Sequence, residues 1–74
     1  MRNRRNIVNE FKDIQLALNM QAPVTAMEHV GRFLMAIQIA YTKDEISSIE
    51  LSLLISIYGK IRTKVMVEII NEYK

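Results

Sequence analysis

The chain has 74 residues, of which 50% are hydrophobic and 24% are charged, and its net charge at neutral pH is +2. This length allows one domain, and the high apolar content argues against disorder. A sequence without cysteine excludes a disulfide framework, a thiolate zinc site and a cysteine nucleophile. Because so small a core is marginal in a monomer, we expect the chain to be a homodimer.

The first predicted helix runs from about residue 3 to residue 19. Its apolar side chains recur at steps of three and four residues, which places them on one helical stripe. These side chains are Ile7, Phe11, Ile14 and Leu18. We expect this helix to end before Pro23, because the residue before a proline avoids the α region. Residues 1–5 are predicted to form a basic, flexible arm.

The second predicted helix covers residues 24–41. Its principal stripe consists of Met27, Val30, Leu34, Ile37 and Tyr41. Other apolar side chains fill the remaining faces, so this helix is predicted to be buried on more than one side. The stretch from Thr42 to Glu45 has the spacing of a capping box, which predicts the start of a third helix.

The third predicted helix carries a stripe of Ile46, Ile49, Leu53 and Ile57. Gly59 is predicted to end or bend this helix. Beyond it the apolar positions continue at steps of four, through Ile61, Val65, Ile69 and Tyr73. The pattern predicts an all-α fold, with residues 1–74 forming a single domain of three to four short helices in a compact bundle.

A strand reading competes with this one in two segments. Residues 33–41 and residues 49–57 alternate apolar with other side chains and are rich in isoleucine, which favours strands. The alternative fold is therefore α+β, with the order α-β-β-α. The capping-box spacing, the two glycines and the lack of a tight hairpin turn favour helices.

The residues typical of catalysis are sparse. His29 is the single histidine, and it is predicted to be an ordinary surface or boundary residue. The carboxylate pairs Glu10 with Asp13 and Glu68 with Glu72 each share a helical face, but neither pair has a third metal ligand at a readable spacing. We predict a protein that is not an enzyme and has no metal or cofactor.

Basic residues gather in two places. One group contains Arg2, Arg4 and Arg5, and the other contains Lys60, Arg62 and Lys64. Such groups could contact phosphates without reading base sequence, so a nucleic-acid-associated regulator is the alternative function. No uncharged run reaches the roughly 20 residues that a membrane span needs. The chain is predicted to be cytoplasmic.

Protein binding is the best-supported class of function. The chain has five methionines, which adapt to irregular binding surfaces, and it has more apolar side chains than three or four short helices can hide. An isologous homodimer is the simplest cover for this surplus. A purely structural dimerisation module is a further alternative.

One short segment resembles a known binding peptide. Gln15-Leu16-Ala17-Leu18-Asn19 is similar to the Gln-Leu-x-Leu-Phe peptide with which bacterial replication and repair proteins bind the DNA sliding clamp. The resemblance implies that Gln15 anchors the peptide and that Leu16 and Leu18 make apolar contacts. Met20, which follows the segment, is predicted to bind the partner as well. Asn19 stands where the family prefers phenylalanine. A tiny basic helical protein with this segment looks like the small phage-encoded inhibitors of the clamp, which implies inhibition of DNA replication.

Overall fold

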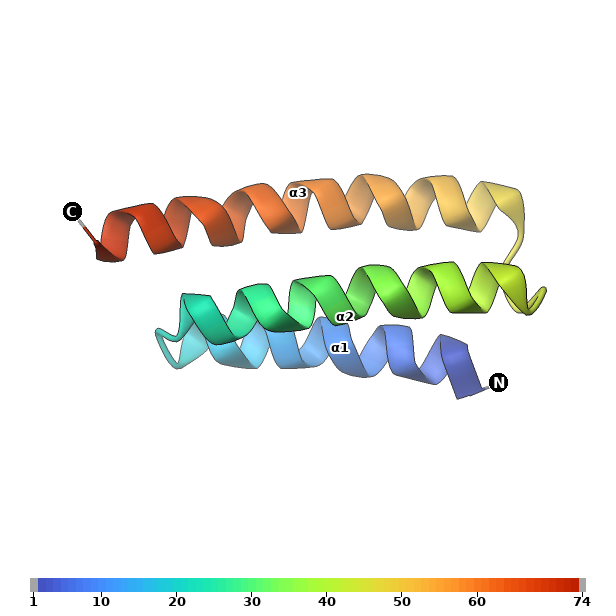
Figure 1. Ribbon diagram of the computed structural model, residues 1–74, viewed down its shortest axis with the longest axis horizontal. Helices are drawn as coiled ribbons and strands as arrows, with labels where there is room; N and C mark the ends of the chain where they lie inside the picture. The colour runs from blue at the N-terminus through green and yellow to red at the C-terminus, as the bar shows by residue number, and fades with distance from the viewer. Residues whose placement is uncertain (1, 74) are drawn as a thin grey trace.

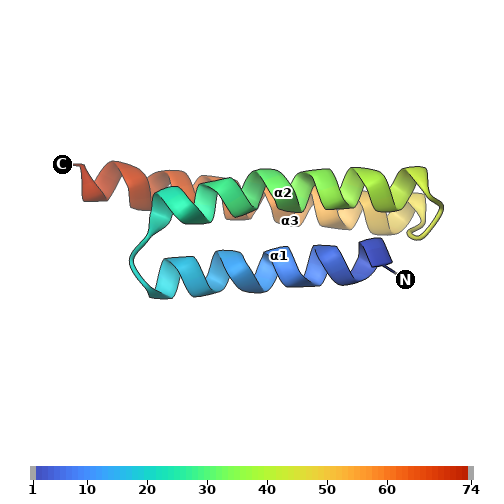
Figure 2. The same cartoon turned by 60° about the horizontal axis from the view of Figure 1, so that its bottom comes forward.

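The structure is a computed structural model that describes residues 2–73. It contains three helices, α1 (Arg2–Asn19), α2 (Pro23–Thr42) and α3 (Ser48–Glu72), which run up, down and up (Figure 1). Both α1 and α3 pack on α2, and the C-terminal end of α3 extends beyond the other two helices (Figure 2). The all-α prediction is confirmed. Residues 2–73 contain no strand, so the α-β-β-α alternative is wrong.

Helix α1 buries the stripe that its spacing predicts. Ile7 and Ile14 are buried, and Phe11 and Leu18 pack against the core from its edge. Residues 2–5 form the first turn of α1, so the prediction of an arm is wrong for them, and residue 1 lies outside the described residues.

Backbone hydrogen bonds stabilise the turn between α1 and α2. Gln21 takes a left-handed conformation with φ 57°, and the Ala22 N–H donates to the Ala17 carbonyl at 2.9 Å. These features satisfy the last carbonyls of α1. Pro23 occupies the first turn of α2, where its missing N–H leaves no hydrogen bond unmade.

Helix α2 lies between the other two helices and is buried on two sides, as predicted. Its buried residues are Pro23, Ala26, Val30, Phe33, Ala36, Ile37 and Ala40. The three alanines allow neighbouring helices to approach closely, because the distance between helix axes depends on side-chain size at the contact. Tyr41, which was expected in the buried stripe, is exposed.

The predicted capping box at Thr42 and Glu45 is wrong. Thr42 is the last residue of α2, and its hydroxyl donates to the Gln38 carbonyl at 2.9 Å. A left-handed residue, Asp44 with φ 58°, then stops the helix. The capping box forms five residues later, where the Ser47 hydroxyl accepts from the Glu50 N–H and the Glu50 carboxylate accepts from the Ser47 N–H.

Glu45, which was predicted to belong to a capping box, instead accepts hydrogen bonds from the first turn of α1. Its carboxylate accepts from the backbone N–H of Asn3 at 3.2 Å and from the Asn3 side-chain amide. The amide hydrogen bond is the main cause that lowers the pKa of Glu45 below its ordinary value. This contact explains why the N-terminal residues join the helix, since one of the free N–H groups of its first turn finds an acceptor.

The prediction for α3 is right in part: Ile46, just before the helix, and Ile61, Val65 and Ile69 in its second half are buried or pack against the core. The residues that face the core are Leu51, Leu54, Tyr58, Ile61, Val65 and Ile69. In the first half of the helix the core-facing positions alternate steps of three and four, through Leu51, Leu54, Tyr58 and Ile61, and lie on another face than the predicted residues there. The predicted Ile49, Leu53 and Ile57 are therefore exposed. Gly59 does not end the helix, which continues to Glu72.

Candidate functional site

An apolar groove lies between α1 and α3. The two helices run in the same direction on either side of α2, and their backbones approach each other closely at very few points (Figures 1 and 2). The groove consists of two adjoining depressions of about 360 and 240 Å³. Their apolar lining residues are Ile7, Val8 and Phe11 from α1, Phe33 from α2, and Ile46, Leu53, Leu54 and Ile57 around α3.

The floor and one end of the groove are fixed by specific contacts. Phe33 is buried, and its ring lies 6.1 Å from that of Phe11 at an angle of 43°. This is within the range in which aromatic rings attract each other. In the first turn of α1, Arg4 forms an ion pair with Glu50 of α3, and both residues line this end of the groove. The Ser47 N–H and then this guanidinium hold the pKa of Glu50 below its usual value.

The walls of the groove are apolar yet open. Val8, Leu53 and Ile57 are 51%, 61% and 41% exposed. Because these side chains are about half exposed, full burial of each would contribute about 1 kcal/mol. The three side chains form a contiguous apolar patch beside a buried aromatic floor and are not isolated exposed residues.

The other end of the groove is polar and basic. Gln15, Leu18, Asn19 and Lys64 line a depression there. Lys60 lies one turn before Lys64 on α3, and Lys12 lies one turn before Gln15 on α1. Among residues 2–73 none of these three lysines forms an ion pair. The groove therefore offers an apolar half and a cationic half.

The residues predicted to bind a partner do not share one face. Gln15 and Leu18 line the polar end of the groove, and Leu18 also packs against the core. Leu16 is 57% exposed and, one residue from Gln15, points about 100° away from it. Met20 is 69% exposed in the turn after α1. The segment is helical, whereas the clamp-binding peptide that it resembles is an extended tail.

The two predicted basic groups do not merge into one patch. Arg4 is neutralised by Glu50, while Arg2 and Arg5 lie on other faces of α1. On α3, Arg62 points about 200° away from Lys60, so the second group is divided between opposite faces. A single continuous surface for a phosphate backbone is not formed by these residues.

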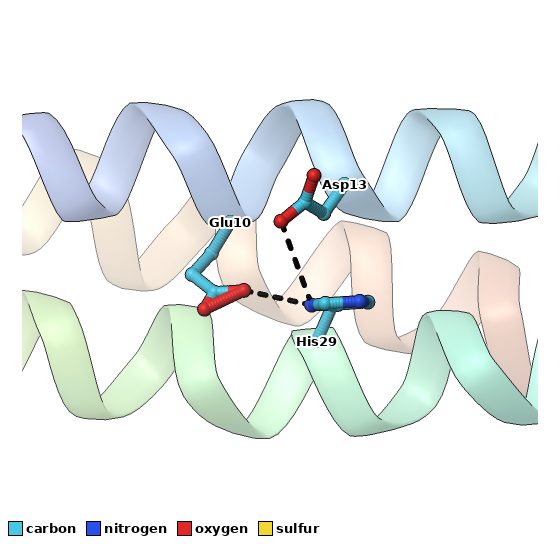
Figure 3. Close-up of side chains that lie close together, drawn as sticks. All are labelled: Glu10, Asp13 and His29. Carbon is cyan, nitrogen blue, oxygen red and sulfur yellow. Dashed lines mark hydrogen bonds and ion pairs between the residues drawn. The ribbon is translucent and has the colours of Figure 1, made fainter.

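A second site joins α1 to α2 on the side away from the groove. His29 Nδ1 lies 2.7 Å from Oε1 of Glu10 and 3.9 Å from Oδ2 of Asp13 (Figure 3). The three ligand atoms all lie within 4.8 Å of one another. The sequence showed the two carboxylates as a pair without a third ligand. His29 is 16 residues after Asp13 in the chain, and the packing of α2 on α1 brings it beside the two carboxylates.

No known family, curated protein or solved structure matches this chain. Within residues 2–73 no helix combines the length and the apolar character that crossing a membrane requires.

Proposed function

We propose that this chain is a non-enzymatic protein-binding regulator whose α1–α3 groove receives an amphipathic helix of another protein. The observation that carries the proposal is the apolar groove, with its buried floor at Phe33 and its exposed walls at Val8, Leu53 and Ile57. Two parallel helices on a third leave the position that the fourth helix of a bundle fills. Helix-in-groove binding is a common form of protein recognition.

The charges around the groove specify the partner further. Lys12, Lys60 and Lys64 carry positive charge without an ion-pair partner among residues 2–73. A helix with an apolar edge and acidic flanks would complement both halves of the groove. The direct test is a titration of the chain with two synthetic helical peptides, which share a leucine edge and carry either glutamate or lysine on the flanks. Tighter binding of the glutamate peptide supports the proposal, and equal or tighter binding of the lysine peptide contradicts it.

We also propose that the regulator is a homodimer. The chain exposes 5299 Å², whereas a monomer of 8.6 kDa is expected to expose about 4,700 Å². The excess of about 600 Å² approaches the roughly 800 Å² that each partner buries in a standard interface. On α3, the flank opposite the groove carries the exposed side chains Ile55, Met66, Ile70 and Tyr73. These residues are the proposed isologous contact.

Replacing Ile70 with glutamate is expected to weaken the dimer at least about tenfold, because a charge would be buried at the contact. Sedimentation at several protein concentrations measures the dissociation constant. Val24→Glu, on α2, is the matched control, since Val24 is similarly exposed and lies outside this flank. A monomeric wild-type chain at high concentration, or equal weakening by both variants, would refute the dimer.

A separate and more specific proposal, which uses residues 15–19 of α1 in place of the apolar groove, is that the partner is the DNA sliding clamp and that binding inhibits replication in the cytoplasm. Its support is the resemblance of residues 15–19 to the clamp-binding peptide and the exposure of Gln15 and Leu16. Since the segment is the last turn of α1, binding in the extended form would require this turn to unwind. Such unwinding would also withdraw Leu18 from the core and break the hydrogen bond from the Ala22 N–H to the Ala17 carbonyl, so the contacts with the clamp would have to offset this cost.

Gln15→Ala is expected to weaken clamp binding by about tenfold or more, since the peptide would lose its anchoring amide. Fluorescence titration with a purified bacterial clamp measures the change. Gln38→Ala, another exposed glutamine on a helix, is the control and should bind as the wild type does. Unchanged affinity in folded Gln15→Ala protein would exclude the clamp reading. A steep loss of partner binding as salt rises would instead favour the phosphate-contacting alternative.

A further inference from the structure

We propose that Glu10, Asp13 and His29 form a binding site for a divalent transition-metal ion, with Zn²⁺ as the reference ion, that fastens α1 to α2. The site is independent of the groove, which lies on the other side of α1. Its evidence is the convergence of one imidazole and two carboxylates, from two helices, within 4.8 Å (Figure 3).

The cluster brings two carboxylates to one imidazole nitrogen. Nδ1 of His29 can donate one proton, and Glu10 accepts it at 2.7 Å. Asp13 is too distant for a hydrogen bond, at 3.9 Å from the same nitrogen. Among residues 2–73 neither carboxylate forms an ion pair with a lysine or an arginine. Two anionic groups therefore converge on one nitrogen that serves only one of them.

A metal ion could be held here after side-chain movements of up to about 1.5 Å, since the two carboxylate oxygens lie within 4.8 Å of each other and tetrahedral ligand atoms lie about 3.3 Å apart. Zn–N and Zn–O bonds of roughly 2.0–2.2 Å place tetrahedral ligand atoms about 3.3 Å apart. Glu10 Oε1 would move away from Nδ1 by about 0.6 Å and Asp13 Oδ2 would approach by a similar amount. The ion would take the place of the Nδ1 proton.

The chemistry of the ligands and the position of the site narrow the choice of ion. An imidazole nitrogen favours Zn²⁺ and its neighbours over Mg²⁺ or Ca²⁺, which prefer oxygen ligands. The His29 and Glu10 side chains are each 19% exposed, and that of Asp13 is 49% exposed. Glu10 and Asp13 also line an open depression with Asn9 and Arg32. Water can therefore complete the coordination from this side, as it does at open zinc sites.

The test is thermal unfolding of the chelator-treated full chain with and without ZnCl₂ at neutral pH. Free Zn²⁺ at about ten times its dissociation constant should raise the Tm by about 5–10 °C, with one ion bound per chain. His29→Gln and Asp13→Asn should each weaken Zn²⁺ binding by at least about tenfold. Glu68→Gln, from the other carboxylate pair, should leave it unchanged, and MgCl₂ should not shift the Tm of the wild type.

Two measurements keep folding and binding apart. Circular dichroism of the metal-free variants shows whether they fold, and Asp13→Asn keeps the Glu10–His29 hydrogen bond intact. Co²⁺, used as a spectroscopic probe, should give a visible absorption band with the wild type that both site variants lack. The proposal is overturned if Zn²⁺ leaves the Tm unchanged, or if a folded His29→Gln or Asp13→Asn variant binds Zn²⁺ as tightly as the wild type.

Discussion

Replacing Phe33 with alanine is expected to lower the free energy of unfolding by about 3–5 kcal/mol. Phe33 is 1% exposed at the centre of α2, where it packs on Phe11 and forms the floor of the α1–α3 groove. Its loss removes a buried aromatic ring and leaves a cavity that the surrounding helices can fill only in part. A domain of this length has a total stability of roughly 4–11 kcal/mol, so the variant should be close to unfolding at ambient temperature.

Urea unfolding followed by circular dichroism measures this difference, at one protein concentration for all variants because association also affects stability. Met35→Ala, also on α2 but 61% exposed, is the control and should change the stability by less than about 0.5 kcal/mol. Similar losses for the two variants would show that α2 does not lie between α1 and α3 as described.

Local patterns in the sequence were enough to predict α1 and α2. The spacing of Ile7 and Ile14 predicts the buried face of α1. Apolar side chains on nearly all faces of α2 predict that it lies between two other helices. The start of α3 was misplaced because two segments carry the same Ser/Thr-x-x-Glu spacing, at Thr42 and at Ser47. Asp44 has a left-handed conformation, so the chain is not helical after Thr42 and the third helix begins only after Ser47. No sequence motif predicts the conformation of Asp44.

Both candidate sites depend on contacts between helices, which spacing along one helix does not reveal. Leu53 and Ile57 looked like core residues, because an apolar stripe has the same pattern whether a neighbour covers it or not. The surplus of apolar side chains did predict that some surface is left uncovered, but not which one. Likewise, Glu10 and Asp13 were visible as a pair, and His29 joins them only through the packing of α1 on α2.

Replacing Leu53 with glutamate is expected to weaken binding of the acidic amphipathic peptide by at least about 30-fold, which corresponds to about 2 kcal/mol. Leu53 lines the apolar half of the groove, where a carboxylate would be buried against the leucine edge of the peptide without a partner. Because Leu53 is 61% exposed in the free chain, its replacement should change the stability by less than about 0.5 kcal/mol. Binding and folding are therefore separable at this position.

The matched control is Ile49→Glu, which makes the same substitution one turn earlier on α3. Ile49 is 73% exposed and does not line the groove, so its replacement should leave peptide affinity almost unchanged. Isothermal titration of both variants with the glutamate-flanked peptide, together with their melting curves, makes the comparison. If Leu53→Glu binds as the wild type does, or if Ile49→Glu weakens binding equally, the peptide does not occupy the groove. A selective loss at Leu53 would locate the bound helix between α1 and α3, because Leu53 lines the groove there and Ile49 does not.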